Sequence, residues 1–193
     1  CSCKSSCTCI KKNGCNCMSC YKLVGFFMRG SEIFFAIESN CEKNSKSRML
    51  HLVKSYLNPK TLEINNCFEL FASYNLYQSA INNNISKCKA KKLRASGFSY
   101  KNGELYILTN YRKSGYLWSV DMCGCKDKLK LKRCCGDILK LEKYPVGLTH
   151  LDNEHLFVIG NTCHNKQFNY YIVKIPFKQT QCKIQIKNEI TLF

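Results

Sequence analysis

Residues 97–110 read GFSYKNGELYILTN, and this stretch decides the fold. It opens with a glycine and a short strand-forming run, passes the turn Asn102-Gly103, and continues into an apolar strand. Asn-Gly between two such segments is one of the stronger sequence signals for a β-hairpin. Residues 25–40, GFFMRGSEIFFAIESN, and residues 147–161, GLTHLDNEHLFVIGN, follow the same pattern. The chain therefore repeats one hairpin three times.

Two further strand-like segments follow each hairpin. The third strands are expected at 48–54, 116–121 and 170–174, and the fourth at 62–64, 129–131 and 182–186. In the last two of these segments lysines alternate with apolar residues, which predicts one buried and one solvent-facing side. Four strands per unit, in tandem, is typical of β-propeller blades. We therefore predict an all-β fold of tandem four-stranded antiparallel, blade-like sheets; an unrelated meander of hairpins is the alternative.

The number of repeats bears on how the sheets are completed. Propellers usually contain about four to eight blades, whereas three repeats are recognised here. The propeller-type fold is therefore expected to be incomplete within this sequence. Self-association to complete the ring of sheets, a fragment of a longer chain, and sheets that stack without closing are the alternatives.

The spacing of the repeats predicts the domain organisation. The opening glycines at 97 and 147 are 50 residues apart, but those at 25 and 97 are 72 apart. An insertion is therefore expected around residues 66–91, with a possible short helix near 68–82. Residues 1–22 form a separate Cys-rich segment, and residues 23–193 form the β-repeat domain.

The best-matching repeats resemble a known family. Residues 92–121, KLRASGFSYKNGELYILTNYRKSGYLWSVD, and residues 143–161, KYPVGLTHLDNEHLFVIGN, resemble bacterial propellers of the esterase-like phytase type. The resemblance implies a propeller fold and, as one possible activity, a secreted or periplasmic esterase- or phosphatase-like hydrolase that uses acidic groups on channel-facing loops. Val146 stands where the family has a glutamate that faces the central channel, so the resemblance does not extend to a channel metal or a catalytic residue.

The charge of the chain points to a different function. Thirty Lys and Arg residues against thirteen Asp and Glu give a formal net charge of +17. Such a charge favours binding to polyanions such as nucleic acids, acidic glycans or anionic lipids. A basic surface without a ligand, in a composition rich in Lys and Asn, is the other interpretation.

Two basic stretches are the candidate binding residues. The first spans 87–101 without any acidic residue, and the second spans 126–133. The candidates are Lys87, Lys89, Lys91, Lys92, Arg94, Lys101, Lys128, Lys130, Lys132 and Arg133. They predict a non-catalytic binding module for an anionic macromolecule or a protein partner.

Sixteen cysteines give a second candidate site. Seven of them lie within the first twenty residues, as Cys1, Cys3, Cys7, Cys9, Cys15, Cys17 and Cys20. Thiolates at this spacing can converge on a soft metal, Zn or Cu, so metal sequestration is one hypothesis. A disulfide scaffold is the other, and the cysteines spread through the repeats favour it. The cysteine content therefore favours a secreted or extracytoplasmic location, with a cytoplasmic one left open.

Other chemistry-bearing residues carry weaker signals. His51 is interpreted as a structural residue, and Asp121 and Asp152 as turn residues. A Cys163–His164 nucleophile pair is a minor hypothesis. No phosphate-binding loop, zinc-protease or serine-hydrolase motif occurs, and no run of eighteen apolar residues predicts a transmembrane helix. The sequence alone therefore leaves binding module, hydrolase and metal sequestration as the competing functions.

Overall fold

The structure is a computed structural model that describes residues 21–39, 48–112, 114–123, 129–131, 133–134, 137–138, 140–142, 145–162, 167–174 and 183–191. The chain divides into two compact units, Cys1–Lys91 and Lys92–Phe193. Within the described ranges, no helix has the length and apolar character needed to cross a membrane.

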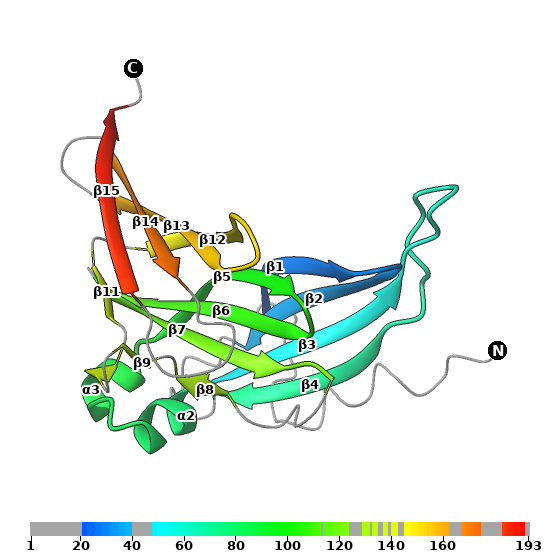
Figure 1. Cartoon of the computed structure of the whole chain (residues 1–193). Helices are drawn as coiled ribbons and strands as arrows, with labels where there is room; N and C mark the ends of the chain where they lie inside the picture. The colour runs from blue at the N-terminus through cyan, green and yellow to red at the C-terminus, as the bar shows by residue number, and fades with distance from the viewer. Residues whose placement is uncertain are drawn as a thin grey trace. The chain divides into compact units, whose positions relative to one another are not determined.

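The first unit contains one antiparallel sheet followed by two short helices (Figure 1). Its strands, in sheet order, are β1 (Tyr21–Arg29), β2 (Glu32–Ser39), β3 (Met49–Tyr56) and β4 (Glu69–Asn75). The β1–β2 turn uses Gly30 at φ +60°, a left-handed conformation that glycine adopts at little cost. The helices are α2 (Leu76–Asn82) and α3 (Lys87–Ala90).

The second unit contains the second and third sheets. The second sheet consists of β5 (Arg94–Lys101), β6 (Glu104–Tyr111) and β7 (Ser114–Asp121), and β7 also pairs with β8 (Lys130–Leu131) and β11 (Lys140–Glu142). A small ribbon joins β9 (Arg133–Cys134) and β10 (Asp137–Ile138). The third sheet has the order β12 (Pro145–His150), β13 (His155–Thr162), β14 (Gln167–Lys174) and β15 (Lys183–Thr191). The predicted all-β class of tandem antiparallel sheets is confirmed.

A β-bulge recurs at the same place in all three sheets. The register shifts just before Gly25, Gly97 and Gly147, and each glycine then pairs with the next strand, opposite Ala36, Leu108 and Ile159 respectively. Facing residues of an antiparallel pair lie on one side of the sheet. Residues at the same offset from these glycines are therefore equivalent in the three sheets.

The shared register defines two faces for every sheet. We call the side that carries the bulge glycine and its partner the glycine face, and the other side the reverse face. In the third sheet, for example, Ile159 lies on the glycine face, whereas Leu148 and Val158 lie on the reverse face. Equivalent positions can then be compared between sheets.

The core of the second unit lies between its two sheets. Tyr106, Leu108 and Leu117 on the glycine face of the second sheet pack against Leu156, Val158 and Val173 on the reverse face of the third, with Leu148 beside them. Six of these side chains are at most 4% exposed. The third sheet thus covers the glycine face of the second.

Gly97 permits close approach of the two inner strands. A Cβ added to Gly97 would lie 3.0 Å from the backbone nitrogen of Leu148. At Gly147, the equivalent position of the third sheet, an added Cβ would meet only Ile159 of its own sheet, at 3.8 Å. Gly97 is thus sterically required in the second sheet. At Gly147 in the third sheet, no described contact requires a glycine.

The structure corrects part of the sequence prediction for the first repeat. Residues 62–64 were expected to be its fourth strand, but Leu62 is in a left-handed conformation (φ +58°) and only an isolated bridge joins Ile64 to Leu57. The fourth strand is β4, within the expected insertion. The short helix is correct over Leu76–Asn82 alone, because β4 occupies the residues before it.

Candidate functional site

The first basic stretch begins on α3, which follows α2 after a turn. The side chain of Asn75 caps α2 by accepting the backbone N–H of Gln78 at 2.8 Å. The helix ends at Asn82 with Asn83 as its C-cap, and Asn84 adopts a positive φ of 62° that reverses the chain. The backbone N–H of Ile85 then bonds to the carbonyl of Ala80 at 3.0 Å. The chain is therefore held in place where the lysines begin.

Buried apolar residues determine which side chains of this stretch face solvent. Ile85, Ala90 and Leu93 are at most 4% exposed, which leaves the intervening lysines pointing outward. Lys87, Lys89, Lys91 and Lys92 are all exposed, and Arg94 is half-buried at the start of β5. We call residues 87–94 the basic segment. These eight residues carry five positive charges and include no acidic residue.

Arg48 links Lys91, just after α3, to the first sheet. Its Nη1 donates to the carbonyl of Lys91 at 3.2 Å, and its Nε lies 4.0 Å from the Glu38 carboxylate. Both side chains are under 10% exposed. A buried guanidinium that binds a main-chain carbonyl fixes the C-terminal end of α3 without using the exposed lysines. The positive charges of α3 thus sit on a fixed backbone.

The structure does not gather all predicted basic residues at one site. Lys101 lies at the far end of β5 from Arg94, about 20 Å away along an extended strand. Lys130 is exposed on β8, which is separated from β5 by β6 and β7. Arg133 starts β9, and Lys128 and Lys132 lie outside the described residues. The second basic stretch is therefore separate from the basic segment.

A second cluster, which sequence reasoning missed, lies where β5 meets β12. Ser99 Oγ is 2.5 Å from Nδ1 of His150, and the ring of Tyr106 meets the His150 ring edge-on at 5.4 Å. The Tyr106 hydroxyl donates to Glu104 at 2.5 Å. Burial lowers the pKa of His150, and the charge of Lys101 lowers it further. The imidazole is thus neutral near pH 7 and could accept a proton from Ser99.

Asp152 is a turn residue, as predicted. Its Oδ1 accepts the backbone N–H groups of Glu154 and His155, at 2.7 and 2.8 Å. These bonds, together with the His155 ring, lower the pKa of Asp152. Asp121 similarly accepts the N–H of Cys123 at 2.9 Å. Both carboxylates therefore stabilise hairpin turns.

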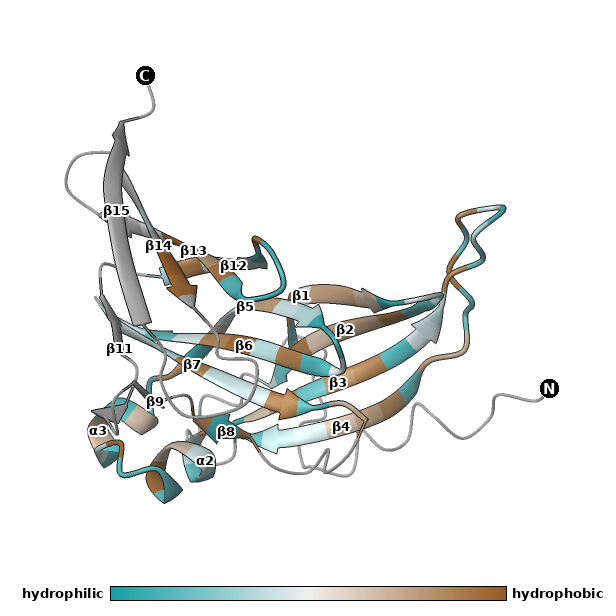
Figure 2. Cartoon of the chain, viewed as in Figure 1, coloured by the Kyte–Doolittle hydropathy of each residue, from teal (hydrophilic) through white to brown (hydrophobic). Residues whose placement is uncertain are grey.

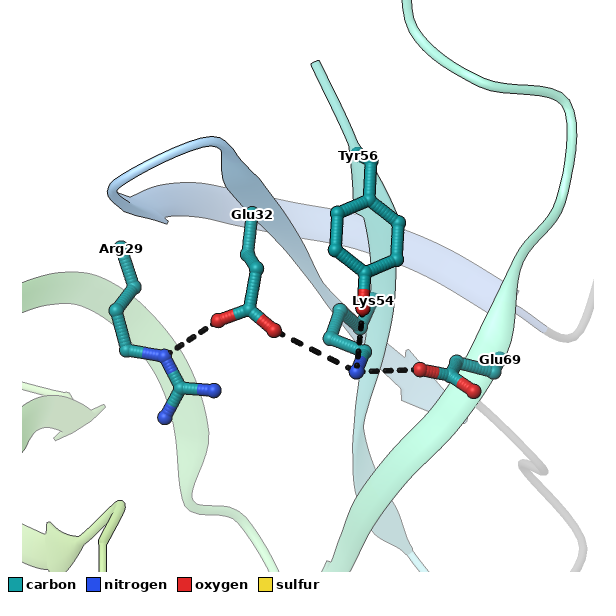
Figure 3. A network of polar contacts seen from close by, with 5 residues as sticks. All are labelled: Arg29, Glu32, Lys54, Tyr56 and Glu69. Carbon is teal, nitrogen blue, oxygen red and sulfur yellow. Dashed lines mark hydrogen bonds and ion pairs between the residues drawn. The ribbon is translucent and has the colours of Figure 1, made fainter.

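A network of charges lies on the glycine face of the first sheet (Figure 3). The Glu32 carboxylate accepts from Arg29 Nε at 2.6 Å and lies 3.5 Å from Lys54 Nζ. Lys54 also pairs with Glu69 and donates to the Tyr56 hydroxyl at 3.3 Å. The hydrogen bond from Arg29 lowers the pKa of Glu32, and the bond to Glu69 raises the pKa of Lys54. Each charge in the network has an opposite neighbour, which is typical of a stabilising rather than a catalytic group.

The remaining predictions concern histidine and cysteine. His51 is buried and its Nδ1 lies 2.8 Å from Ser73 Oγ, which confirms its structural role. Cys88 and Cys123 are exposed free thiols. Among the described residues no three His, Cys, Asp or Glu side chains form a metal site. The seven N-terminal cysteines, Cys163 and His164 lie outside the described residues, so Zn or Cu binding stays a prediction.

No family model matches the chain, and no curated protein matches it.

Proposed function

We propose that this chain is a non-catalytic binding module that holds an anionic macromolecule on its basic segment. The observation that carries the proposal is the exposure of Lys87, Lys89, Lys91 and Lys92 on a backbone anchored by Ala90 and Leu93. Clustered lysines in a segment without acidic residues attract phosphate or sulfate groups and release their counterions on binding. The net charge of +17 adds a favourable long-range field.

Matched variants test this proposal. Lys87, Lys89 and Lys91 are replaced together by serine, and a control replaces Lys22, Lys60 and Arg112, which are exposed elsewhere and are not candidate binding residues. Both variants lose three charges, so a difference between them reports position rather than net charge. Binding to heparin and to single-stranded RNA is measured against salt concentration.

We expect the basic-segment variant to bind at least about tenfold more weakly at low salt and to show a shallower salt dependence. The control should lose much less. Equal losses in the two variants, or an affinity that does not change with salt, would contradict the proposal. Comparison of heparin with RNA distinguishes an acidic glycan from a nucleic acid as the ligand class.

A hydrolase is the second candidate, and the contact between Ser99 and His150 favours it. Ser99 is 8% exposed, so a substrate would need this contact to open. Wild type and Ser99→Ala are compared for turnover of a p-nitrophenyl ester and for labelling by a fluorophosphonate. Labelling of Ser99, lost in the variant, would support the hydrolase; an unlabelled wild type would leave the Ser99–His150 contact as a tie between two sheets.

The proposal includes a propeller-type arrangement and self-association. The strand order of each sheet and the packing of the third sheet on the second support blade-like repeats. Three repeats fall short of a closed ring, so a second copy is proposed to complete it. A secreted or extracytoplasmic location is also proposed, and it rests on the cysteine content.

A further inference from the structure

Two sheet faces of this chain carry exposed apolar side chains among the described residues. On the reverse face of the first sheet, Phe26 is 62%, Met28 43% and Leu70 41% exposed. Phe35, which pairs with Phe26, is half-buried and contacts the ring of Phe68. Figure 2 shows brown, apolar colour over much of β1. Single exposed apolar residues are ordinary, but a contiguous set on one face indicates an interaction surface.

The glycine face of the third sheet is the second open surface. Ile159 is 38% exposed, Phe157 and Tyr170 are half-buried, and their two rings stack at 5.4 Å. The opposite side of the same strands is closed, because Leu156 and Val158 are fully buried against the second sheet. Only one side of the third sheet is thus covered among the described residues.

Because the three sheets share one register, each open face can be compared with the equivalent face of a sheet that is already covered. Phe157, Ile159 and Tyr170 are equivalent to Tyr106, Leu108 and Leu117, which lie under the reverse face of the third sheet. Likewise, Phe26 and Phe35 of the first sheet are equivalent to Leu148 and Val158. The open face of the first sheet is therefore equivalent to the reverse face of the third sheet, and the open face of the third sheet is equivalent to the glycine face of the second. These two kinds of face already pack together where the third sheet covers the second.

Gly147 provides an independent argument. Its equivalent, Gly97, is needed because Leu148 on the next inner strand lies against it. Among the described residues, nothing outside its own sheet lies within 4 Å of an added Cβ at Gly147. A glycine at this position allows an inner strand to approach closely, as β12 approaches β5.

We propose that a second copy of this chain docks the reverse face of its first sheet on the glycine face of the third sheet. This inference names the surfaces for the self-association proposed above and does not depend on polyanion binding. Phe26 and Phe35 of one copy would lie over Gly147, Phe157 and Ile159 of the other. Because the two faces differ, the contact is heterologous, and two such contacts close a pair. The pair holds six repeats, within the range of known propellers.

The test uses exposed positions, so that the fold survives substitution. Phe26→Asp alters one face and Ile159→Asp the other, while Leu62→Asp, at a 73% exposed leucine outside both faces, is the control. Gly147→Val fills the space left for the partner strand. Mass is measured by light scattering and sedimentation over a range of micromolar concentrations, in high salt so that no polyanion bridges the copies. Circular dichroism verifies that each variant is folded.

We expect wild type and Leu62→Asp to have twice the chain mass of 22.3 kDa. Phe26→Asp, Ile159→Asp and Gly147→Val should each dissociate at least about tenfold more readily, because a charge or an added side chain enters the apolar contact. A mixture of Phe26→Asp and Ile159→Asp should form a pair again, because one intact contact remains between the unaltered faces.

Three results would overturn the proposal: a wild type that is monomeric at every concentration, face variants that dimerise like wild type, or a mixture that stays monomeric. The variant with Lys87, Lys89 and Lys91 replaced by serine should still dimerise. Loss of polyanion binding and loss of dimerisation are therefore separate outcomes.

Discussion

Ser99 on β5 and His150 on β12 are joined by a contact of 2.5 Å between Oγ and Nδ1, and this contact ties the second sheet to the third. The two residues are 51 positions apart in the sequence. They meet because the absence of a side chain at Gly97 lets β12 approach β5 closely. The polar contact thus lies at the edge of the apolar core formed by Leu108, Val158 and their neighbours.

Protonation of His150 should weaken this junction. Burial lowers its pKa in the folded state, so below pH 6.5 the unfolded chain binds the proton more readily than the folded one. Stability is therefore full above the unfolded pKa and is lost as the pH falls through the lower folded value. Urea unfolding at pH 7.5 and pH 5 should show a larger loss for wild type than for His150→Asn.

His51 provides the internal control for that comparison. Burial also lowers its pKa, so wild type and His150→Asn share its contribution and their difference isolates His150. An identical pH dependence in the two proteins would show that His150 is not protonated preferentially in the unfolded chain.

Gly97, Gly115 and Gly147 should differ in their tolerance of alanine. A Cβ at Gly115 would collide with Pro145 and lie 2.7 Å from the carbonyl of Thr109, whereas at Gly97 it would lie 3.0 Å from Leu148. We expect losses of about 3 kcal/mol for Gly115→Ala and about 1–2 kcal/mol for Gly97→Ala, with Gly147→Ala within about 0.5 kcal/mol. Denaturant unfolding in the Phe26→Asp background measures these values without a bound second copy.

The order of the three losses is the decisive result. If Gly147→Ala destabilised this background as much as Gly97→Ala, Gly147 would have a close contact within its own chain. The space beside Gly147 would then not serve a partner strand.

The sequence predicted the repeat because glycine, turn and apolar strand recur in fixed order. It did not predict the bulge before Gly25, since a register shift depends on pairing across strands. The fourth strand of the first repeat was misplaced because β4 has its own bulge, between Leu70 and Ala72, which interrupts the alternation. Asn75 followed by Gln78, an N-cap pattern, was the available signal that β4 ends and a helix begins.

The candidate site was predictable in composition but not in arrangement. The exposure of Lys87 and Lys89 follows from their position between buried Ile85 and Ala90. The separation of Lys101 and Lys130 from this segment follows from strand length and sheet order, which charge counting does not include. No local pattern indicated Ser99 and His150, because their contact exists only once two sheets have packed.

Lys54 should stabilise the first sheet measurably. Its side chain is 15% exposed and bonds to Glu32, Tyr56 and Glu69. We expect Lys54→Met to reduce the free energy of unfolding by about 2 kcal/mol at pH 7, while exposed Lys60→Met changes it by less than about 0.5 kcal/mol.

Low pH should remove the difference in stability between wild type and Lys54→Met. The pKa of Glu32 is lowered in the folded state, so its contribution is present above the unfolded value near 4.5 and is lost as the pH falls through the folded value. Wild type and Lys54→Met should therefore converge in stability as the pH falls through the folded-state pKa of Glu32. A difference that persists below that pKa would indicate that Lys54 acts through packing of its aliphatic chain.

Cys88 and Cys123 should react with a maleimide in the native protein without reductant. Both thiols are exposed and free, so neither access nor oxidation protects them. Peptide mapping after native labelling should find both residues modified, with serine variants at each position as controls for assignment. Recovery of either cysteine in a disulfide-linked peptide would contradict this expectation and support a wider disulfide scaffold.

Thr109 should stabilise the second sheet through its bond to the single tryptophan. Trp118 Nε1 donates to Thr109 Oγ1 at 2.8 Å, and both residues are fully buried. Thr109→Val keeps the shape of the side chain but leaves the indole N–H without this acceptor, at an expected cost of about 1–3 kcal/mol. Because Trp118 is the only tryptophan, its fluorescence during urea unfolding reports on this sheet specifically. Exposed Thr61→Val should change the midpoint little, and an equal stability of Thr109→Val and wild type would mean that the indole bond contributes no net stability.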